Sequence, residues 1–311
     1  MPSSDADAAV EFPAFFFSHG STMMLGEPSA PAAYWEQVGR LAIEQGVERI
    51  VMMGAHWHVE GDHFEVATNP KPSKQPVAWV DPKKYINFDP NYDVDFAQHV
   101  LRELEDAGID ARPCPKFEII HDTFLILKWM FPRGKSLPLV IISSNVHFDP
   151  HQHLQIGVAL RHLRRQRCLL IGSGGAVHNL YRNSFSQAVF HRDNFAQERQ
   201  PEQWALDFGQ AFSDAVQYNS GPGLRRAVTR LMMHPQFRDA HATDDHFMPA
   251  IFAAGAAGAP EDEGKPNFPG AECWELLNMR NTQYQLGYWP YEPRVTEVPE
   301  HKKIGIAPPP A

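Results

Sequence analysis

The feature that most constrains the fold is a short apolar segment that ends at a histidine. Residues 12–17 read FPAFFF, and the chain then changes to the small, polar run Ser18-His19-Gly20-Ser21. An apolar run of this length without polar alternation is typical of a strand that is buried on both faces of a sheet. The small residues indicate the turn that follows it. We therefore expect His19 at the carboxyl end of a central strand, which is where open α/β sheets bind ligands.

A second segment repeats this pattern. Residues 47–55 (VERIVMMGA) run into His56-Trp57-His58, and the intervening residues 31–45 carry apolar side chains at helical spacing. A strand, a helix and a strand in this order form a βαβ unit, whose two strands are parallel. His19 and His56 are thus predicted to lie at the same edge of one sheet.

Two further segments put histidines in the same setting. Residues 168–172 (CLLIG) form an apolar segment that runs into a small-residue turn and His178. Residues 243–249 (TDDHFMP) open a predicted helix, with Thr243 as its N-cap and His246 close behind. Each of the four histidines alone is more often a structural residue than a ligand. Together they favour a metal site, because imidazole is a common neutral metal ligand and strand ends converge on one edge.

Other histidines have competing interpretations. Residues two apart on a strand face the same way, so His56 and His58 could bind one zinc ion, as in a zinc hydrolase. His147, His151 and His153 surround a predicted helix start, and we interpret them as surface or capping residues.

Length and composition predict one α/β domain. We assign residues 11–291 to this single domain, 1–10 to a disordered tail and 292–311 to an extended tail, because 311 residues can bury a full core. The net charge of −9 argues against a nucleic-acid partner and against an anionic membrane surface. The three cysteines are widely spaced and indicate neither a disulfide framework nor a thiolate zinc site. With no signal-peptide pattern and no apolar run near the ~18 residues of a membrane span, we expect a cytoplasmic monomer or small homo-oligomer.

Two loops and one hairpin complete the prediction. The loops at 69–89 and 181–200 are expected to shape a pocket, and neither carries a pattern that names a ligand. Residues 272–279 and 282–288 are predicted to pair as a hairpin around Arg280-Asn281.

Five motifs follow one another along about residues 12–288: SHGS at 18–21, GAHWH at 54–58, HDTF at 121–124, GSGGAVHNL at 172–180 and TDDHFMP at 243–249. Together they resemble the motifs of the class III (LigB-type) extradiol ring-cleavage dioxygenases, and they are most similar to the branch that includes the DOPA 4,5-dioxygenases. The resemblance implies a three-layer α/β/α sandwich with a central, mostly parallel or mixed sheet. It also implies non-haem Fe(II) as cofactor and a catechol and O2 as substrates.

The resemblance assigns a role to each matching residue. It implies that His19, His56 and His246 bind the metal. His178 would be the acid/base residue facing the substrate, with a pKa near its ordinary value of ~6.5. His121 would be a second catalytic residue in the pocket wall, near a substrate hydroxyl or the oxygen.

Some positions depart from the family pattern and leave alternatives open. Thr22 stands where the family has proline, and Ile120-His121-Asp122 replaces its Asp-His-Gly element. Asp245 stands where a glutamate precedes the last histidine. Because more distant relatives use a carboxylate ligand, Asp245 competes with His246 for the third position. Three histidines also suit zinc, so the alternative is a zinc-dependent hydrolase or a zinc-bound small-molecule-binding relative on the same fold.

Overall fold

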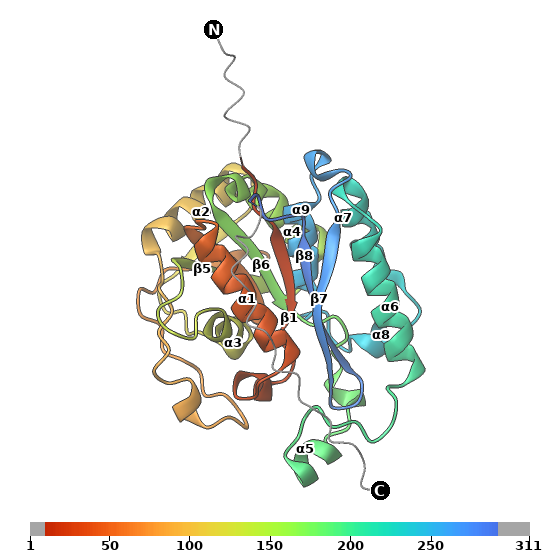
Figure 1. The fold of residues 1–311 in the computed structure, drawn as a ribbon. Coiled ribbons are helices and arrows are strands. Elements are labelled where there is room, and N and C mark those ends of the chain that lie inside the picture. The colour runs from red at the N-terminus through yellow and green to blue at the C-terminus, as the bar shows by residue number, and fades with distance from the viewer. Residues whose placement is uncertain (1–9, 292–311) are drawn as a thin grey trace, which may run out of the picture.

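The computed structural model describes residues 10–291, so the tails expected at 1–10 and 292–311 lie outside the described residues, apart from Val10. The described chain folds around one mixed sheet (Figure 1). Its strands are β1 (Ala14–Ser18), β2 (Arg49–Val59), β3 (Phe64–Ala67), β4 (Ala111–Cys114), β5 (Leu139–Asn145), β6 (Cys168–Gly174), β7 (Asn267–Glu275) and β8 (Met279–Leu286). Their order in the sheet is β4-β3-β5-β2-β6-β1-β8-β7.

The four central strands β5, β2, β6 and β1 are mutually parallel, and antiparallel pairing occurs only toward the sides of the described sheet. β1 and β2 are therefore parallel, as the βαβ pattern predicts, but β6 lies between them. The carboxyl ends of all four strands meet at one edge of the sheet.

Helices cover both faces of this sheet. They are α1 (Ala30–Glu44), α2 (Val94–Asp106), α3 (His121–Met130), α4 (Pro150–Leu160), α5 (Ser186–His191), α6 (Gln203–Gln217), α7 (Gly221–Arg230), α8 (Phe237–Ala240) and α9 (Met248–Ala257). In Figure 1, α1 crosses the near face, whereas α4 and α9 lie behind the sheet. This arrangement confirms the predicted α/β sandwich. Within residues 10–291, every helix is too short or too polar to span a lipid bilayer.

The phenylalanine run of β1 explains why both faces must be covered. Side chains alternate between the faces of a strand. Phe15 and Phe17 pack in the core beneath α1, where they meet Trp35, and Phe16 packs in the opposite core with Phe212 of α6 and Phe252 of α9. All residues of β1 are buried, so the prediction of a doubly covered strand is confirmed.

The C-terminal hairpin is real, but its predicted turn is wrong. β7 ends at Glu275 and β8 begins at Met279, so the turn lies at residues 276–278 and not at Arg280-Asn281. Arg280 and Asn281 are paired residues of β8. The turn was missed because Leu276 and Leu277, both at positive φ, are not residues that signal a turn.

His153 is also placed differently from the prediction. It is fully buried on α4, where its Nε2 lies 2.6 Å from the Ser144 hydroxyl of β5 and its Nδ1 lies 2.7 Å from the Asp149 carbonyl oxygen. His151 is exposed on the same helix, as expected, and His147 pairs with Asp62. His153 therefore fastens α4 to the sheet.

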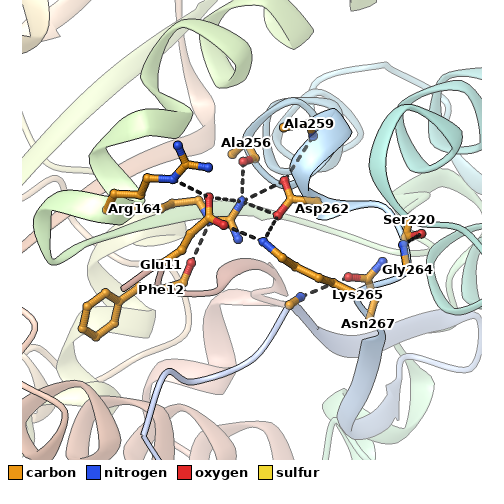
Figure 2. A network of polar contacts seen from close by, with 12 residues as sticks. Glu11, Phe12, Arg164, Ser220, Ala256, Ala259, Asp262, Gly264, Lys265 and Asn267 are labelled. Carbon is orange, nitrogen blue, oxygen red and sulfur yellow. Dashed lines mark hydrogen bonds and ion pairs between the residues drawn. The ribbon is translucent and has the colours of Figure 1, made fainter. Parts of the chain in front are cut away.

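A buried arginine joins the start of β1 to the end of α9 (Figure 2). Arg164 donates from Nε to the Phe12 carbonyl oxygen at 2.7 Å and from Nη1 to the Ala256 carbonyl oxygen at 2.9 Å. The same nitrogen pairs with Asp262 at 3.2 Å, and Lys265 adds a second cation to that carboxylate at 3.0 Å. With only 2% of its surface exposed, Arg164 has its charge and its donors satisfied by the protein itself.

We expect Arg164→Met to lower the free energy of unfolding by about 3–5 kcal/mol, because it leaves buried acceptors without a donor and a buried carboxylate without one of its cations. The matched control is Arg165→Met. The Arg165 side chain is 43% exposed, and its Nε lies 3.8 Å from Glu11 Oε1, which is a long distance for an ion pair. Its loss should therefore cost less than about 1 kcal/mol. Urea unfolding of both variants measures the difference, and equal losses would show that burial of the Arg164 network is not stabilising.

The buried imidazole of His153 should make stability depend on pH. Burial lowers the pKa of His153 to about 4 in the folded protein, whereas the unfolded chain has the ordinary value of 6.5. Below pH 6.5 the unfolded chain therefore binds a proton that the folded protein does not, and stability falls until about pH 4. In His153→Gln, the slope of unfolding free energy against pH should decrease by up to about 1.4 kcal/mol per pH unit in this window. Urea unfolding from pH 4.5 to 7.5 tests this, with His151→Gln as the exposed control, and an unchanged slope in His153→Gln would contradict it.

Candidate metal centre

Five histidine rings from separate segments meet at the carboxyl edge of the central strands. The ring centroids of His19 and His56 are 5.6 Å apart, those of His19 and His246 are 5.2 Å apart, and those of His56 and His246 are 4.8 Å apart. The centroid of His121 lies 4.5 Å from that of His56. The ring of His178 stacks on His246 at 3.5 Å. The structure thus brings together His19, His56, His121, His178 and His246, the five histidines to which the resemblance assigns a role.

The strand ends deliver three of these rings. His19 follows β1, and its backbone N–H donates to the Gly174 carbonyl oxygen at 3.0 Å, which extends the pairing of β1 with β6. His56 lies in β2, and His178 lies in the loop that follows β6. His121 is the first residue of α3, which covers this part of the sheet.

His246 reaches the same place because the start of α9 approaches β6 very closely. A Cβ atom on Gly174 would lie 2.1 Å from the His246 carbonyl oxygen, and one on Gly172 would lie 2.1 Å from the Pro249 carbonyl oxygen. The Gly175 N–H donates to the His246 carbonyl oxygen at 3.0 Å. Only glycine leaves room for this contact.

A serine orients the His19 ring. The Ser173 hydroxyl donates to the Asp122 carbonyl oxygen at 2.5 Å, so its proton is committed and its oxygen accepts from His19 Nδ1 at 3.1 Å. His19 then carries its proton on Nδ1. Its Nε2 is fully buried, has no hydrogen-bond partner within residues 10–291 and presents a lone pair to the cluster.

A carboxylate orients the His246 ring in the same way. Asp245 Oδ2 lies 3.1 Å from His246 Nδ1, and the Thr243 hydroxyl donates to Asp245 Oδ1 at 2.6 Å. His246 Nε2 is likewise buried without a partner. Thr243 therefore holds Asp245 and is not the predicted N-cap, since α9 begins at Met248 after Phe247.

These side chains fit a divalent metal. Their ligand atoms form two overlapping groups, in each of which all atoms lie within 4.8 Å of one another: His19, His56 and His121, and His56, Asp245 and His246. The predicted set of His19, His56 and His246 takes members from both groups. Nε2 of His19 and Nε2 of His246 are buried without a hydrogen-bond partner among the described residues, and His56 belongs to both groups. These three imidazoles are a donor set that iron and zinc both accept.

Burial keeps the imidazoles of His19 and His178 neutral. It lowers the pKa of His19 and His178 well below 6.5, and the nearby His246 lowers both pKa values further. The expectation that His178 titrates near 6.5 is therefore wrong for the protein without metal. Burial would raise the pKa of the Asp245 carboxyl, but hydrogen bonds from His246 and Thr243 outweigh it and lower that pKa, so Asp245 is ionised.

A cavity of about 390 Å³ opens above the histidines. His56, His121 and His178 lie at its inner end. Its sides come from the turn after β1 and from both loops that were predicted to shape a pocket, through Trp79 of loop 69–89 and Phe185 of loop 181–200. A ligand in this cavity would contact the histidines at one end.

The predicted His56–His58 pair does not form a site. The pairing of β2 with β5 is irregular between Met53 and His58, which breaks the regular alternation of side chains. His58 is exposed and its ring packs against Phe148 at 5.3 Å. It belongs to neither ligand group within the described residues.

Sequence reasoning missed three supporting residues. Ser173 and Asp122 position His19 as described, and the Asp122 carboxylate also accepts the backbone N–H of His56 at 2.8 Å. Glu275 is fully buried and accepts from Ser21, both from its N–H at 2.8 Å and from its hydroxyl at 2.6 Å, and so fixes the turn after His19. Ser173 and Asp122 lie inside motifs that could have drawn attention to them, but nothing in the sequence around Glu275 does so.

Known proteins resemble this chain over most of its length. A family model described as the catalytic LigB subunit of aromatic ring-opening dioxygenase matches residues 13–273. A 4,5-DOPA dioxygenase extradiol-like protein of Schizosaccharomyces pombe is 26% identical over 268 residues, which cover 78% of this chain and 84% of that protein. The 4,5-DOPA dioxygenase extradiol of Beta vulgaris is 25% identical over 258 residues, covering 78% and 86%. The crystal structure of an uncharacterised Escherichia coli K12 protein, 20% identical, has the same fold, with a TM-score of 0.68 over 89% of this chain and all of that one.

The orienting role of Ser173 predicts a specific loss of metal affinity. Ser173→Ala removes the acceptor that holds the His19 proton on Nδ1, so we expect Zn(II) to bind about 10–100-fold more weakly. Competition with a chromophoric chelator measures the dissociation constant. The control is Ser143→Ala, which removes another buried strand serine; its hydroxyl accepts from the Glu65 N–H and bonds to no histidine among the described residues. If both variants bind zinc as the unmodified protein does, Ser173 does not position a ligand.

Proposed function

Because the chain belongs to the family of the catalytic LigB subunit of aromatic ring-opening dioxygenases, we propose that it is a non-haem Fe(II) extradiol dioxygenase. Its substrates would be a catechol, DOPA-like or related, and O2, and the ring would open beside the hydroxyl pair. Relatives that carry the name 4,5-DOPA dioxygenase extradiol support this proposal at 22–25% identity.

The observation that carries the proposal is that Nε2 of His19 and Nε2 of His246 are both buried without a hydrogen-bond partner among the described residues. They lie beside a cavity that could hold an aromatic ring. We assign His19, His56 and His246 as the metal ligands. Asp245 is then the residue that orients His246 through Nδ1, rather than a ligand itself. Three neutral imidazoles leave the charge of a divalent ion uncompensated, which favours an anionic, chelating catechol.

Ferrous iron bound by these ligands would supply the redox chemistry that lets a catechol react with O2. His178 supplies the proton transfer. Its ring is held against His246 at the inner end of the cavity and is neutral, so it can accept a proton from a catechol hydroxyl and return it later.

His121 binds the substrate from the other side of the cavity. It lines the inner end with His56, and burial lowers its pKa as well, so its neutral ring can accept or donate a hydrogen bond to a substrate hydroxyl. The apolar side chains above it exclude water from the reacting groups.

Zinc is the alternative to iron, because the same imidazole donors suit it. It would make the chain a zinc-dependent hydrolase or a zinc-bound small-molecule-binding relative on this fold. Oxygen uptake distinguishes the two. After anaerobic loading with Fe(II), a catechol should consume one equivalent of O2 and yield a yellow ring-opened product, and the zinc-loaded protein should not. Catechol binding without oxygen uptake in the iron-loaded protein would overturn the proposal.

His178→Ala should lower kcat by about 10²–10⁴-fold, because it removes the proton acceptor, while iron content stays close to one per chain. His246→Ala should instead lose the metal. Iron analysis and oxygen-electrode kinetics measure both effects. His58→Ala, which alters an exposed histidine of the same strand edge, is the control and should keep both iron and activity. Full activity in His178→Ala would exclude it as the acid/base residue.

A further inference from the structure

The outer part of the cavity has a chemical character that the metal chemistry does not require. Beyond the histidines, large apolar side chains form one side of it, and we call this set the apolar wall: Leu180, Phe185, Val189 and Leu276. Leu180, Phe185 and Val189 are 51%, 44% and 59% exposed. Exposed apolar side chains gathered around a cavity indicate a bound apolar group.

The backbone that presents Leu276 is strained. Leu276 and Leu277 form the turn between β7 and β8 with φ values of 51° and 76°. Two successive residues of positive φ are normal in hairpin turns only when they are Asn, Asp or Gly, because a larger side chain clashes with the backbone there. Strain of this kind persists where the surrounding structure enforces it, and it concentrates at functional sites.

The surrounding structure does enforce it here. The Leu276 N–H donates to the Asn194 carbonyl oxygen at 3.0 Å, and the Leu276 carbonyl oxygen accepts from the Ser184 N–H at 2.8 Å. Both partners belong to the segment that carries Phe185 and Val189. The neighbouring Glu275 is held by Ser21 and Asn281. The turn is thus fixed to the loop after β1 and to the rest of the apolar wall, and it directs one of its two leucines into the cavity.

Among the described residues, no aspartate, glutamate, lysine or arginine lines this cavity. Exposed carboxylates and cations line an adjacent cavity of about 520 Å³. The two cavities share Met23, Trp79, Ala188 and Val189 as a partition, and the charges lie beyond it: Glu27, Asp81, Lys84 and Arg192. Lys84 already pairs with Glu27 at 3.4 Å. A carboxylate held close to the catechol ring would therefore lose its water without gaining a cation.

From these observations we infer that the substrate is a catechol with an uncharged, apolar substituent, and that Leu276 is a specificity-determining residue. This inference rests on the proposed function for its catechol. The substituent contacts the apolar wall while the hydroxyl pair faces His121 and His178. This narrows the DOPA-like or related catechol of the proposed function: amino-acid catechols such as DOPA itself, and benzoate-type catechols, carry a charge close to the ring and are disfavoured.

Two ligands of matched length test the inference: 4-propylcatechol and 3-(3,4-dihydroxyphenyl)propionate, which differ in a terminal methyl group or carboxylate. Binding to the zinc-loaded protein, measured by calorimetry, requires no turnover. We expect the dissociation constant of 4-propylcatechol to be lower on the order of tenfold or more, because a desolvated, unpaired carboxylate is strongly rejected. The same preference should appear in kcat/KM of the iron-loaded protein.

Variants of the strained turn distinguish the effect of the Leu276 side chain on specificity from the effect of the backbone strain. Leu276→Asn eases the strain of the positive φ and removes the apolar contact, so the preference for 4-propylcatechol should fall at least about fivefold. Because Leu276 is only 2% exposed, the melting temperature is measured alongside to verify that the variant is folded. Leu277→Asn eases the backbone strain of the same turn, but the Leu277 side chain does not line the cavity. This variant should keep the preference for 4-propylcatechol. Val189→Arg places a cation in the wall and should shift the preference toward the propionate.

The outcomes distinguish this inference from the proposed function. Equal or tighter binding of the propionate by the zinc-loaded protein overturns the inference, whatever the iron-loaded protein does. A preference for 4-propylcatechol without oxygen uptake supports the apolar specificity and overturns only the dioxygenase. If Leu276→Asn and Leu277→Asn alter the preference equally, Leu276 does not determine specificity.

Discussion

The whole site depends on the close contact between β6 and the start of α9. Gly172 and Gly174 leave no room for side chains there, and this lets a helix that begins late in the chain lie against the central strand. His246 is thereby brought beside His19, which follows β1, and His56, which lies in β2; these two strands flank β6. Parallel strands bring residues together at one edge of the sheet. A ligand that approaches this edge from outside the sheet has to come from another element. The helix start provides this ligand because two glycines allow the approach.

Once gathered, the imidazoles must remain neutral, and this neutrality connects folding with metal binding. Burial disfavours a charge on His19, His56 and His178, and each protonated ring would repel its neighbours. Ser173 and Asp245 determine which nitrogen of His19 and of His246 carries the proton. Nε2 of His19 and Nε2 of His246 are therefore left with buried lone pairs that accept no hydrogen bond from the described residues. A divalent ion would satisfy both, and its binding free energy would add to the stability of the fold.

The sequence predicted the sheet, its doubly buried strands and the convergence of the histidines, because each depends on local patterns. An apolar run followed by small residues and a histidine is visible along the chain at His19, His56 and His178. The supporting contacts were not visible, since Glu275 meets Ser21 across more than two hundred residues. The turn at residues 276–278 was misplaced because tertiary contacts, not residue preference, hold its leucines at positive φ. The assignment of individual histidines as ligands or acid/base residue stays a prediction.

The position of β1 in the sheet has a consequence for how the protein is made. β1 is the first strand of the described chain, yet it pairs on one side with β6 and on the other with β8, the last strand. While a ribosome is still producing residues 279–286, one edge of this phenylalanine-rich strand has no neighbour, and unpaired apolar edges are prone to aggregate. β1 gains its second neighbour only after residues 279–286 have left the ribosome. Until then, the edge of β1 that faces β8 is open to pairing with other chains.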